Sequence, residues 1–378
     1  MDTLTHALVG VAISRAGFKD RVPFATTALV IAANLPDVDG IFAWNGVLYL
    51  HYHRGLTHSL LAWPIWTVLV ALGLRYAARC RAERRRQRLP SPAVVEAGRA
   101  GGPPVRSLPI EDLLPPEAAG AKYRVPGWGV ALLLGAVGVG SHLLLDWTNG
   151  FGVRLLAPFS RHWFALDIEP IVDPWIWVLL LLFLLAPMVL GLVGGEIGAR
   201  ERPHRASAAV ALVLVGIWCG WRTVNHDRAL AWLGTQTFSG AAPLSLAAFP
   251  VTGTPRQWRA VISLPDRYEL ADVDTSDLRI TNLAPQTIFK PAPSPAILMA
   301  ESTSAGQVFL DFARFPLAMV GRDENGTIVL LTDLRYKSAF APVRMGLLVR
   351  EDRRLSVEST RFYWHGAGAQ LPGENEEQ

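Results

Sequence analysis

Two residues that can ligate a metal lie four positions apart near the end of a long apolar run. His142 and Asp146 enclose the three leucines of the segment HLLLD. On a helix, residues four apart share a face, so the imidazole and the carboxylate can reach one cation. Ionisable groups at membrane depth are costly and mark functional sites by default. The alternative is a hydrogen-bonded pair at a helix end without metal, because turn residues follow Asp146 and place it near the interface.

Two further motifs place ligands where they can meet this pair. One is Thr5-His6, one turn into a short apolar run. The other is the segment PDVD, in which Pro36 disfavours helix at the preceding residue, so that a broken helix presents Asp37 and Asp39. In an extended turn these carboxylates share a face, whereas in a helix they diverge by ~200°. An ordinary polar helix cap is the alternative to a cation site.

The remaining motif is HRGLTHS, at residues 53–59. Thr57 suits the N-cap of the helix that follows it. Arg54 supplies a fixed cation that can hold a phosphate or a carboxylate group. His53 and His58 add two imidazoles, so the motif combines metal ligands with an anion-binding group.

The candidate metal ligands are imidazoles and carboxylates, with no thiolate among them. They are His6, Asp37, Asp39, His53, His58, His142 and Asp146. This set suits an open, water-carrying site for Zn²⁺, with Mn²⁺ or Fe²⁺ as alternatives, rather than a closed structural zinc site. Seven ligands exceed what one zinc ion needs, which indicates two neighbouring divalent metals. Two-metal sites stabilise in-line displacement at phosphorus.

The elements that must position these motifs are apolar runs typical of membrane helices. The 378 residues are 51% hydrophobic and 18% charged, whereas soluble domains carry about 25% charged residues. Six runs approach the ~20 apolar residues that a membrane crossing takes, and the first of them is short. They are 4–16, 22–44, 57–78, 125–147, 174–194 and 206–224. We therefore predict a polytopic α-helical membrane domain of about six helices.

Basic residues are concentrated in alternate connections between these runs. The stretch 75–124 is rich in arginine, and further basic residues follow the first and the fifth runs. Because basic loops stay in the cytoplasm, all the ligand motifs are expected on the extracytoplasmic side. This rule also accounts for the net charge of +4 without nucleic acid as a partner. The Pro-, Gly- and Ala-rich linker at 89–121 is expected to be irregular.

Beyond about Leu233 the composition changes to short runs of β-forming residues. The expected strands are 258–264, 268–273, 277–282, 307–312, 317–322, 327–331, 345–350 and 355–362. Asn325-Gly326 is a strong hairpin signal between two of them. We predict that an antiparallel β-rich extracytoplasmic domain at 233–366 follows a membrane domain at 1–232, with a disordered tail at 367–378.

In combination these motifs resemble the YdjM-like family, inner-membrane-associated proteins regarded as metal-dependent hydrolases, whose founding member is LexA-regulated. The likeness covers residues 1 to about 177, includes Asp167 and Asp173, and leaves open whether either joins the site. It is carried by MxxxTH at 1–6, PDxD at 36–39, HRGxTHS at 53–59 and HxxxD at 142–146. The order of ligands is also similar, more remotely, to zinc-dependent phospholipase C. That second likeness implies a set of metal ligands: His6, Asp37, His53, His142 and Asp146.

The motifs and the resemblance favour a multi-pass protein of the bacterial inner membrane that hydrolyses a phosphoester or lipid-linked substrate at the extracytoplasmic face. Asp37 or Asp39 would orient or deprotonate the attacking water, and Arg54 would bind the anionic group. A metal-binding regulator or assembly factor acting through the β-rich region is the alternative. A transporter is less favoured, because alternating access needs a site near the midplane of the membrane. The expected partners are membrane lipid and a protein that binds the β-rich region.

Overall fold

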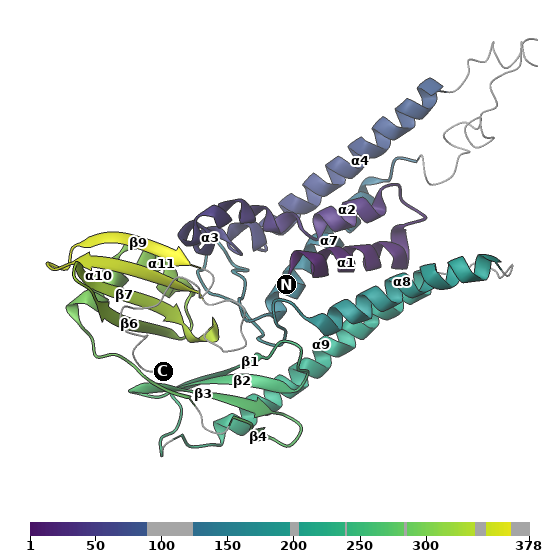
Figure 1. The fold of residues 1–378 in the computed structure, drawn as a ribbon. Helices are drawn as coiled ribbons and strands as arrows, with labels where there is room; N and C mark the ends of the chain where they lie inside the picture. The colour runs from purple at the N-terminus through teal and green to yellow at the C-terminus, as the bar shows by residue number, and fades with distance from the viewer. Residues whose placement is uncertain (89–123, 197–203, 239, 283–285, 337–344, 364–378) are drawn as a thin grey trace, which may run out of the picture.

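The described part of the chain has a helical half followed by a half that contains two antiparallel sheets, as the computed structural model shows (Figure 1). The structure describes residues 1–88, 124–196, 204–238, 240–282, 286–336 and 345–363. The expectations for the linker at 89–121 and the tail at 367–378 concern segments outside these residues. The succession of a helical and a β-rich half agrees with the predicted fold class.

The helical half begins with short elements and ends with long helices. Its elements, with η marking 3-10 helix, are α1 (Thr3–Ile13), a π-helical turn (Ser14–Phe18), α2 (Ala25–Ala32), η2 (Leu35–Trp44), α3 (Gly46–Tyr52), η3 (Leu56–His58), α4 (Ala62–Arg88), α7 (Trp128–Thr148), α8 (Pro174–Glu196) and α9 (His204–Gly234). α8 and α9 lie side by side, and α4 packs along α7 (Figure 1).

Within the described ranges, two helices are long and apolar enough to cross a membrane, namely α7 and the segment Arg205–Gly234 of α9. A third span is reached if Gly46–His58 and Ala62–Gln87, which are bent by 73°, count as one. α1 and α2 have 11 and 8 residues, fewer than the ~20 that a crossing takes. The structure therefore supports two or three spans, and six crossings stay a prediction.

The sequence-based boundaries around the ligand motifs are partly confirmed. α2 ends before Pro36, and the PDVD segment continues as 3-10 helix, so the predicted break is present. The predicted N-cap role of Thr57 is wrong, because α4 begins only at Ala62, whose N–H donates to the Ser59 hydroxyl. The helix also extends beyond the apolar run that ends at residue 78. Arginine, alanine and glutamate are good helix formers, and α4 continues through them to Arg88.

α7 lies close to α2 and α4 because small residues face both neighbours. A Cβ atom added at Gly135 would lie 2.7 Å from the Thr67 carbonyl oxygen, and one at Gly138 would lie 2.4 Å from the Ala32 Cβ. Small residues allow helix backbones to approach closely in membrane proteins. This packing brings the last turns of α7 against the chain that follows α2.

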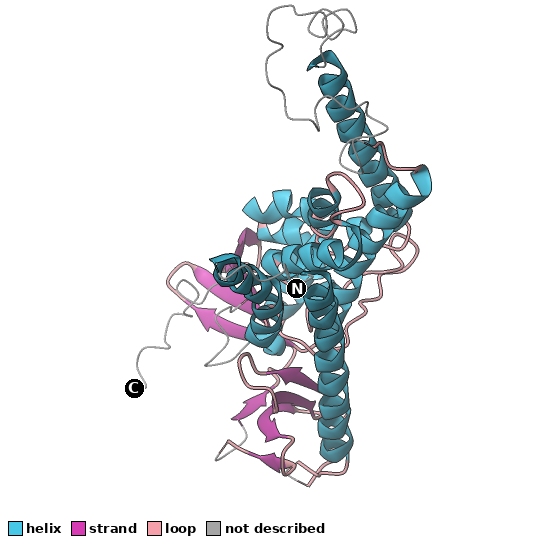
Figure 2. Cartoon of the chain, turned by 90° about the vertical axis from the view of Figure 1, so that its right-hand side faces the viewer, coloured by secondary structure: helices cyan, strands magenta, loops and turns pink. Residues whose placement is uncertain are grey.

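The β-rich half contains two sheets, in which all the paired strands are antiparallel. Figure 2 shows the strands gathered beside one end of the long helices. The first sheet has β1 (Ser245–Pro250), β2 (Gln257–Ser263), β3 (Arg267–Asp274), β4 (Arg279–Ile280) and β5 (Gln286–Phe289). The second has β6 (Pro316–Arg322), β7 (Gly326–Asp333), β8 (Gly346–Asp352) and β9 (Val357–Tyr363). The predicted hairpin at Asn325-Gly326 is confirmed, since it joins β6 to β7.

One predicted strand is wrong, because residues 307–312 lie in a helix. They belong to α11 (Ser304–Phe312), which follows α10 (Pro295–Ser302). The Thr303 hydroxyl accepts a hydrogen bond from the Gly306 N–H and caps α11. Ala305, Phe309 and Phe312 recur at helical spacing and are all buried.

The second sheet shares a hydrophobic core with the helical half. Leu50 of α3 and Phe151, which follows α7, are buried among residues of α10, α11, β7 and β8. α3 leads directly into the HRGLTHS motif, so this core lies next to the candidate ligands. The β-rich half is thus in contact with the segments that carry the site.

Candidate metal centre

α7 presents His142 and Asp146 on one face of its last two turns, as their spacing predicts. The His142 Nε2 atom lies 3.3 Å from Asp146 Oδ2, and both side chains are fully buried. The His142 Nδ1 atom lies 2.7 Å from the Ala33 carbonyl oxygen, just beyond the end of α2. A carbonyl only accepts, so Nδ1 carries the proton. In a neutral His142 the Nε2 atom then has a free lone pair, and this atom is the one that lies near the Asp146 carboxylate.

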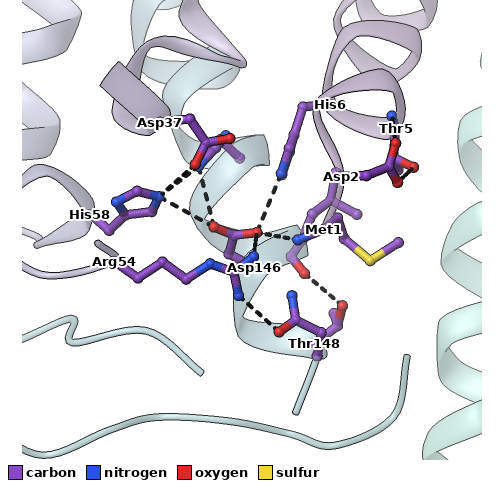
Figure 3. A network of polar contacts seen from close by, with 12 residues as sticks. Met1, Asp2, Thr5, His6, Asp37, Arg54, His58, Asp146 and Thr148 are labelled. Carbon is purple, nitrogen blue, oxygen red and sulfur yellow. Dashed lines mark hydrogen bonds and ion pairs between the residues drawn. The ribbon is translucent and has the colours of Figure 1, made fainter. Parts of the chain in front are cut away.

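Asp37 of η2 and His58 of η3 complete a four-residue group with this pair. Figure 3 shows Asp37 and His58 directed towards Asp146. We call Asp37, His58, His142 and Asp146 the central cluster; one ligand atom from each lies within 4.8 Å of all the others. His58 Nε2 is 3.3 Å from both Asp37 Oδ1 and Asp146 Oδ2. His142 Nε2 is 3.7 Å from Asp37 Oδ1. Segments 109 residues apart along the chain therefore meet at one point.

The donor set of the central cluster fits a divalent cation. The Thr57 hydroxyl donates to Asp39 Oδ2 at 2.6 Å, so it can only accept from His58 Nδ1, which lies 2.9 Å away. A neutral His58 therefore also has a lone pair at Nε2, and this atom is 3.0 Å from His142 Nε2. The two facing nitrogens beside two carboxylates need positive charge between them, which a proton on one imidazole or a bound cation can supply. Imidazole and carboxylate ligands without a thiolate are typical of Zn²⁺, Mn²⁺ or Fe²⁺.

A second group of possible ligands contains Asp37, Asp39 and His53. Asp39 is tied to its neighbours: His53 Nδ1 lies 2.8 Å from Oδ1, and the Arg54 N–H donates to Oδ2 at 3.1 Å. His58 Nδ1 is 3.3 Å from the same Oδ2 atom. A carboxylate behind a metal-binding histidine fixes its tautomer and ring orientation. Asp39 is in position to do this for both His53 and His58.

The two carboxylates of η2 favour their ionised forms. Burial opposes ionisation of Asp37, but hydrogen bonding with His58 outweighs it, and the pKa is lowered to about 2. Burial likewise opposes ionisation of Asp39, but hydrogen bonds with His53 and His58 lower its pKa well below the usual value. Both groups are therefore anionic acceptors at neutral pH.

His6 lies at the edge of the central cluster on α1. Its Nε2 atom is 3.3 Å from Asp146 Oδ1, and its ring stacks on His142 with centroids 4.0 Å apart. His6 is fully buried, yet neither ring nitrogen has a hydrogen-bond partner among the described residues. A buried polar group without a partner is costly, so an unpaired imidazole here also fits a ligand. The amino group of Met1 contacts the same carboxylate oxygen (Figure 3).

Arg54 is buried and directed at Asp146. Its Nη2 atom lies 3.0 Å from Asp146 Oδ1, and Nη1 donates to the Asn149 side chain at 2.8 Å. The guanidinium lies 4.8 Å from the centre of the Phe151 ring. Arg54 itself has a positive φ of 56°, uncommon for a residue with a side chain. Sequence reasoning missed Asn149 and Phe151, although they directly follow the HxxxD motif.

Asp167 and Asp173 lie outside both groups of possible ligands. Asp167 forms a bidentate ion pair with Arg314 of the β-rich half, with both distances 2.8 Å. Asp173 caps α8 by accepting from the Trp175 N–H at 2.7 Å. Both carboxylates are thus engaged in structural contacts.

Sequence reasoning also missed Glu169, which lies fully buried between the central cluster and α9. Its N–H donates to the Thr148 carbonyl at the end of α7, and its Oε2 atom lies 3.8 Å from Arg222 Nε. Burial, reinforced by hydrogen bonding with Asp173, raises the pKa of Glu169 to about 9. Glu169 is therefore neutral at pH 7.

Known proteins resemble the helical half of this chain. The family model described as YdjM inner membrane protein matches residues 1–229, which include every candidate ligand. The uncharacterized protein YfhP of Bacillus subtilis (strain 168) is 26% identical over 187 residues, which are 47% of this chain and 43% of that protein. The chain thus spans less than half the length of this curated relative.

No solved structure gives a significant match, and the remote similarity to zinc-dependent phospholipase C finds no counterpart in these comparisons. The family match, in contrast, covers more than half of the chain and all the motifs on which the resemblance was based. It also agrees with the apolar helices of a membrane protein. The chain therefore belongs to the YdjM inner membrane protein family.

Proposed function

We propose that this protein is a membrane-bound, metal-dependent hydrolase that acts on a phosphoester or a lipid-linked substrate. The observation that carries the proposal is the central cluster, in which two imidazole nitrogens and two carboxylates from three separate segments converge within 4.8 Å. A site that holds a cation explains this arrangement.

Asp37, His58, His142 and Asp146 would hold one divalent cation, with zinc preferred for this ligand set. His53 and Asp37 would hold a second, because Asp37 belongs to both groups of possible ligands. A bound pair of divalent cations supplies Lewis acidity at a phosphoryl oxygen and stabilises an in-line displacement.

The remaining polar residues would position this machinery. Asp39 would keep the His53 and His58 rings in one tautomer through its contacts with their Nδ1 atoms. Asp37 is the member of the central cluster with an accessible side chain, at 23% exposure, so it is placed to take a proton from an attacking water. Arg54 would orient Asp146, and binding of an anionic substrate group by Arg54 would require it to release Asn149.

Metal analysis together with a hydrolysis screen tests the proposal. The purified wild type should hold a divalent metal and cleave a member of a panel of phosphodiester, phosphomonoester and lipid substrates. Asp146→Asn should lose metal and activity together, because a carboxamide is an uncharged and poor ligand. Asp272→Asn, which changes a carboxylate paired with Arg259 in the first sheet, is the control and should keep both.

A metal-loaded wild type that is inert on the whole panel would favour a second function, that of a metal-binding regulator or assembly factor. One observation favours this alternative: the β-rich half lies wholly beyond the family match and yet shares a core with α3. A protein partner bound by that half could then sense the state of the site.

We further propose the bacterial inner membrane as the location, with several crossings and with the β-rich half on the extracytoplasmic side. The arginine-rich end of α4 supports this orientation, since basic segments stay in the cytoplasm. A reporter enzyme that is active only in the periplasm should be active when fused after Gly326. An inactive fusion at this position, in a protein that is inserted and stable, would reverse the orientation.

A further inference from the structure

A groove lined by hydrocarbon side chains runs between α2 and α4. Its volume is about 330 Å³, which lies within the range of roughly 300–1,000 Å³ found for small-molecule sites. Its walls include Phe24, Ile31 and Leu35 on one side and Trp66, Gly73 and Ala77 on the other. Ile31 is 52% exposed, so the groove is open along its length.

The groove extends over three turns of α4. From Trp66 to Ala77 the helix rises roughly 16 Å, at ~1.5 Å per residue. At the end near Ala77, the Arg81 guanidinium lies over the Phe24 ring at 5.1 Å. α4 belongs to the bent pair that is apolar and long enough to cross a membrane. A membrane crossing by this pair would place the groove against the hydrocarbon region of a bilayer.

The other end of the groove lies next to the segments that carry Asp37 and His58. Leu35 stands two residues before Asp37. The Trp66 indole N–H donates to the Thr57 carbonyl at 2.8 Å, directly before His58. Two of the four ligands of the central cluster thus adjoin one end of an apolar channel.

The segments around Asp37 also expose apolar side chains. Ile41 and Trp44 of η2 are 67% and 77% exposed, and Leu56 of η3 is 57% exposed. Exposed apolar side chains gathered in one place mark a surface that contacts a partner or a membrane. Trp side chains are enriched at the membrane–water interface. A molecule that reaches Asp37 past these residues would come from the membrane surface.

We propose that the groove between α2 and α4 holds one hydrocarbon chain of a membrane lipid whose phosphate-bearing head group lies at the central cluster. The placement of the head group at the central cluster rests on the proposed function, because a bound cation would attract the phosphate. The placement of the hydrocarbon chain rests on the groove alone. A lipid is the occupant that matches both features, a hydrocarbon wall at membrane depth and a cation site at its end.

A substitution at Gly73 tests the occupancy of the groove. Among the described residues, no atom lies within 4 Å of the place that a Cβ would take at Gly73. The Cβ of Gly73→Leu would therefore meet no neighbour, the rest of the side chain would enter the groove that Gly73 lines, and leucine favours helix more than glycine does. Gly216→Leu is the matched control, because Gly216 is equally open on α9.

The measurement is binding of dioleoyl and dihexanoyl phosphatidic acid to the full-length protein in detergent, by native mass spectrometry. Gly73→Leu should weaken binding of the dioleoyl lipid roughly tenfold or more, the loss expected when two methylene groups stay unburied. Binding of the dihexanoyl lipid and the metal content should not change. Gly216→Leu should behave as the wild type.

Unchanged dioleoyl binding by Gly73→Leu, or an equal loss in Gly216→Leu, would overturn the proposal. Unchanged lipid binding combined with a loss of dimer in Gly73→Leu would identify a second copy of the chain as the occupant. If Gly73→Leu loses the long-chain lipid while the wild type hydrolyses nothing, the groove is supported and the proposed function fails. If the rate of hydrolysis depends neither on the length of the lipid chains nor on Gly73→Leu, the proposed function is supported and the proposed role of the groove is wrong.

Discussion

The two sides of the central cluster are held in different ways. On the helix side, His142 and Asp146 project from α7, whose backbone is packed against α2 at Gly138. On the loop side, His58 lies in a short 3-10 turn, and hydrogen bonds and ion pairs of single side chains hold it and Arg54 in place. Backbone hydrogen bonds and close packing support one side, whereas individual polar contacts support the other. The two sides should therefore respond differently to substitution.

The loop side also depends on the β-rich half. Arg335 donates to the Gly150 carbonyl and to the Phe312 carbonyl, each at 2.7 Å. Gly150 lies between Asn149 and Phe151, the two residues that contact the Arg54 guanidinium. A contact made about 185 residues away in the chain thus bears on the orientation of Asp146.

The largest effect is expected from breaking the helix side. Gly138→Leu would place its side chain in the backbone contact with Ala32, and overpacking of this kind costs about 1–3 kcal/mol or more. We expect a lower melting temperature together with loss of bound metal. Gly129→Leu is the control on the same helix, since Gly129 faces open space among the described residues. Equal losses of melting temperature and bound metal in both variants would show that the contact at Gly138 is not what holds the helix side of the site.

A smaller effect is expected from Arg54→Lys on the loop side. Lysine keeps the charge but cannot donate to Asp146 and Asn149 in the same fork-like geometry. Residues that orient metal ligands typically change metal affinity by ~10–100-fold, and a loss of that size is expected with an unchanged melting temperature. Arg256→Lys, at an exposed position in the β-rich half, should keep the affinity of the wild type. Titration with Zn²⁺ against a competing chelator measures both, and an unaltered affinity in Arg54→Lys would contradict the positioning role.

Arg335→Lys sharpens the comparison further. Lysine can keep the ion pair with Asp333 but cannot reach both carbonyl groups at once. Arg335 acts on Arg54 only through residues 149–151. Its loss should therefore weaken metal binding less than Arg54→Lys does, roughly severalfold. Arg279→Lys, an exposed position in the first sheet, is the control. A larger loss in Arg335→Lys than in Arg54→Lys would show that the β-rich half supports the site by another route.

The smallest effect on metal binding is expected at Glu169, in the segment between the two sides, where the pH acts on stability. Because Glu169 has a folded-state pKa raised to about 9, the folded state prefers its neutral form. The stabilising contribution is full below the ordinary pKa near 4.5 and is lost as the pH rises towards 9. Glu169→Gln should therefore melt close to the wild type at pH 5 and be clearly more stable than the wild type at pH 8. Identical pH profiles for the two proteins would show that Glu169 is ionised in the fold.

Local geometry accounts for the parts of the site that the sequence predicts well. The HxxxD spacing is enough to put His142 and Asp146 on one helix face, because neighbouring turns are set by backbone hydrogen bonds. Pro36 is enough to end helix before the PDVD segment, and Asn325-Gly326 is enough to mark a hairpin. Each of these predictions depends on residues within a few positions of one another.

The wrong predictions concern segments whose structure depends on residues far away in the sequence. Residues 307–312 alternate too weakly for a strand, and they form helix because Phe309 and Phe312 bury themselves in a core that includes Leu50. Thr57 has the right type for an N-cap, but its hydroxyl instead donates to Asp39, 18 residues away. A short apolar segment is compatible with either structure, and its tertiary contacts make the choice.

The sequence by itself determined which residues can ligate a metal and that they stand at helix ends and breaks. Only the tertiary structure decided that Asp39 contacts both His53 and His58, that Arg54 faces Asp146, and that Leu35 lines one end of an apolar groove. Ligand chemistry belongs to each side chain and is therefore visible in its residue type. Contacts between separate segments depend on how whole helices pack, and the free energy of that packing is spread over many residues at once.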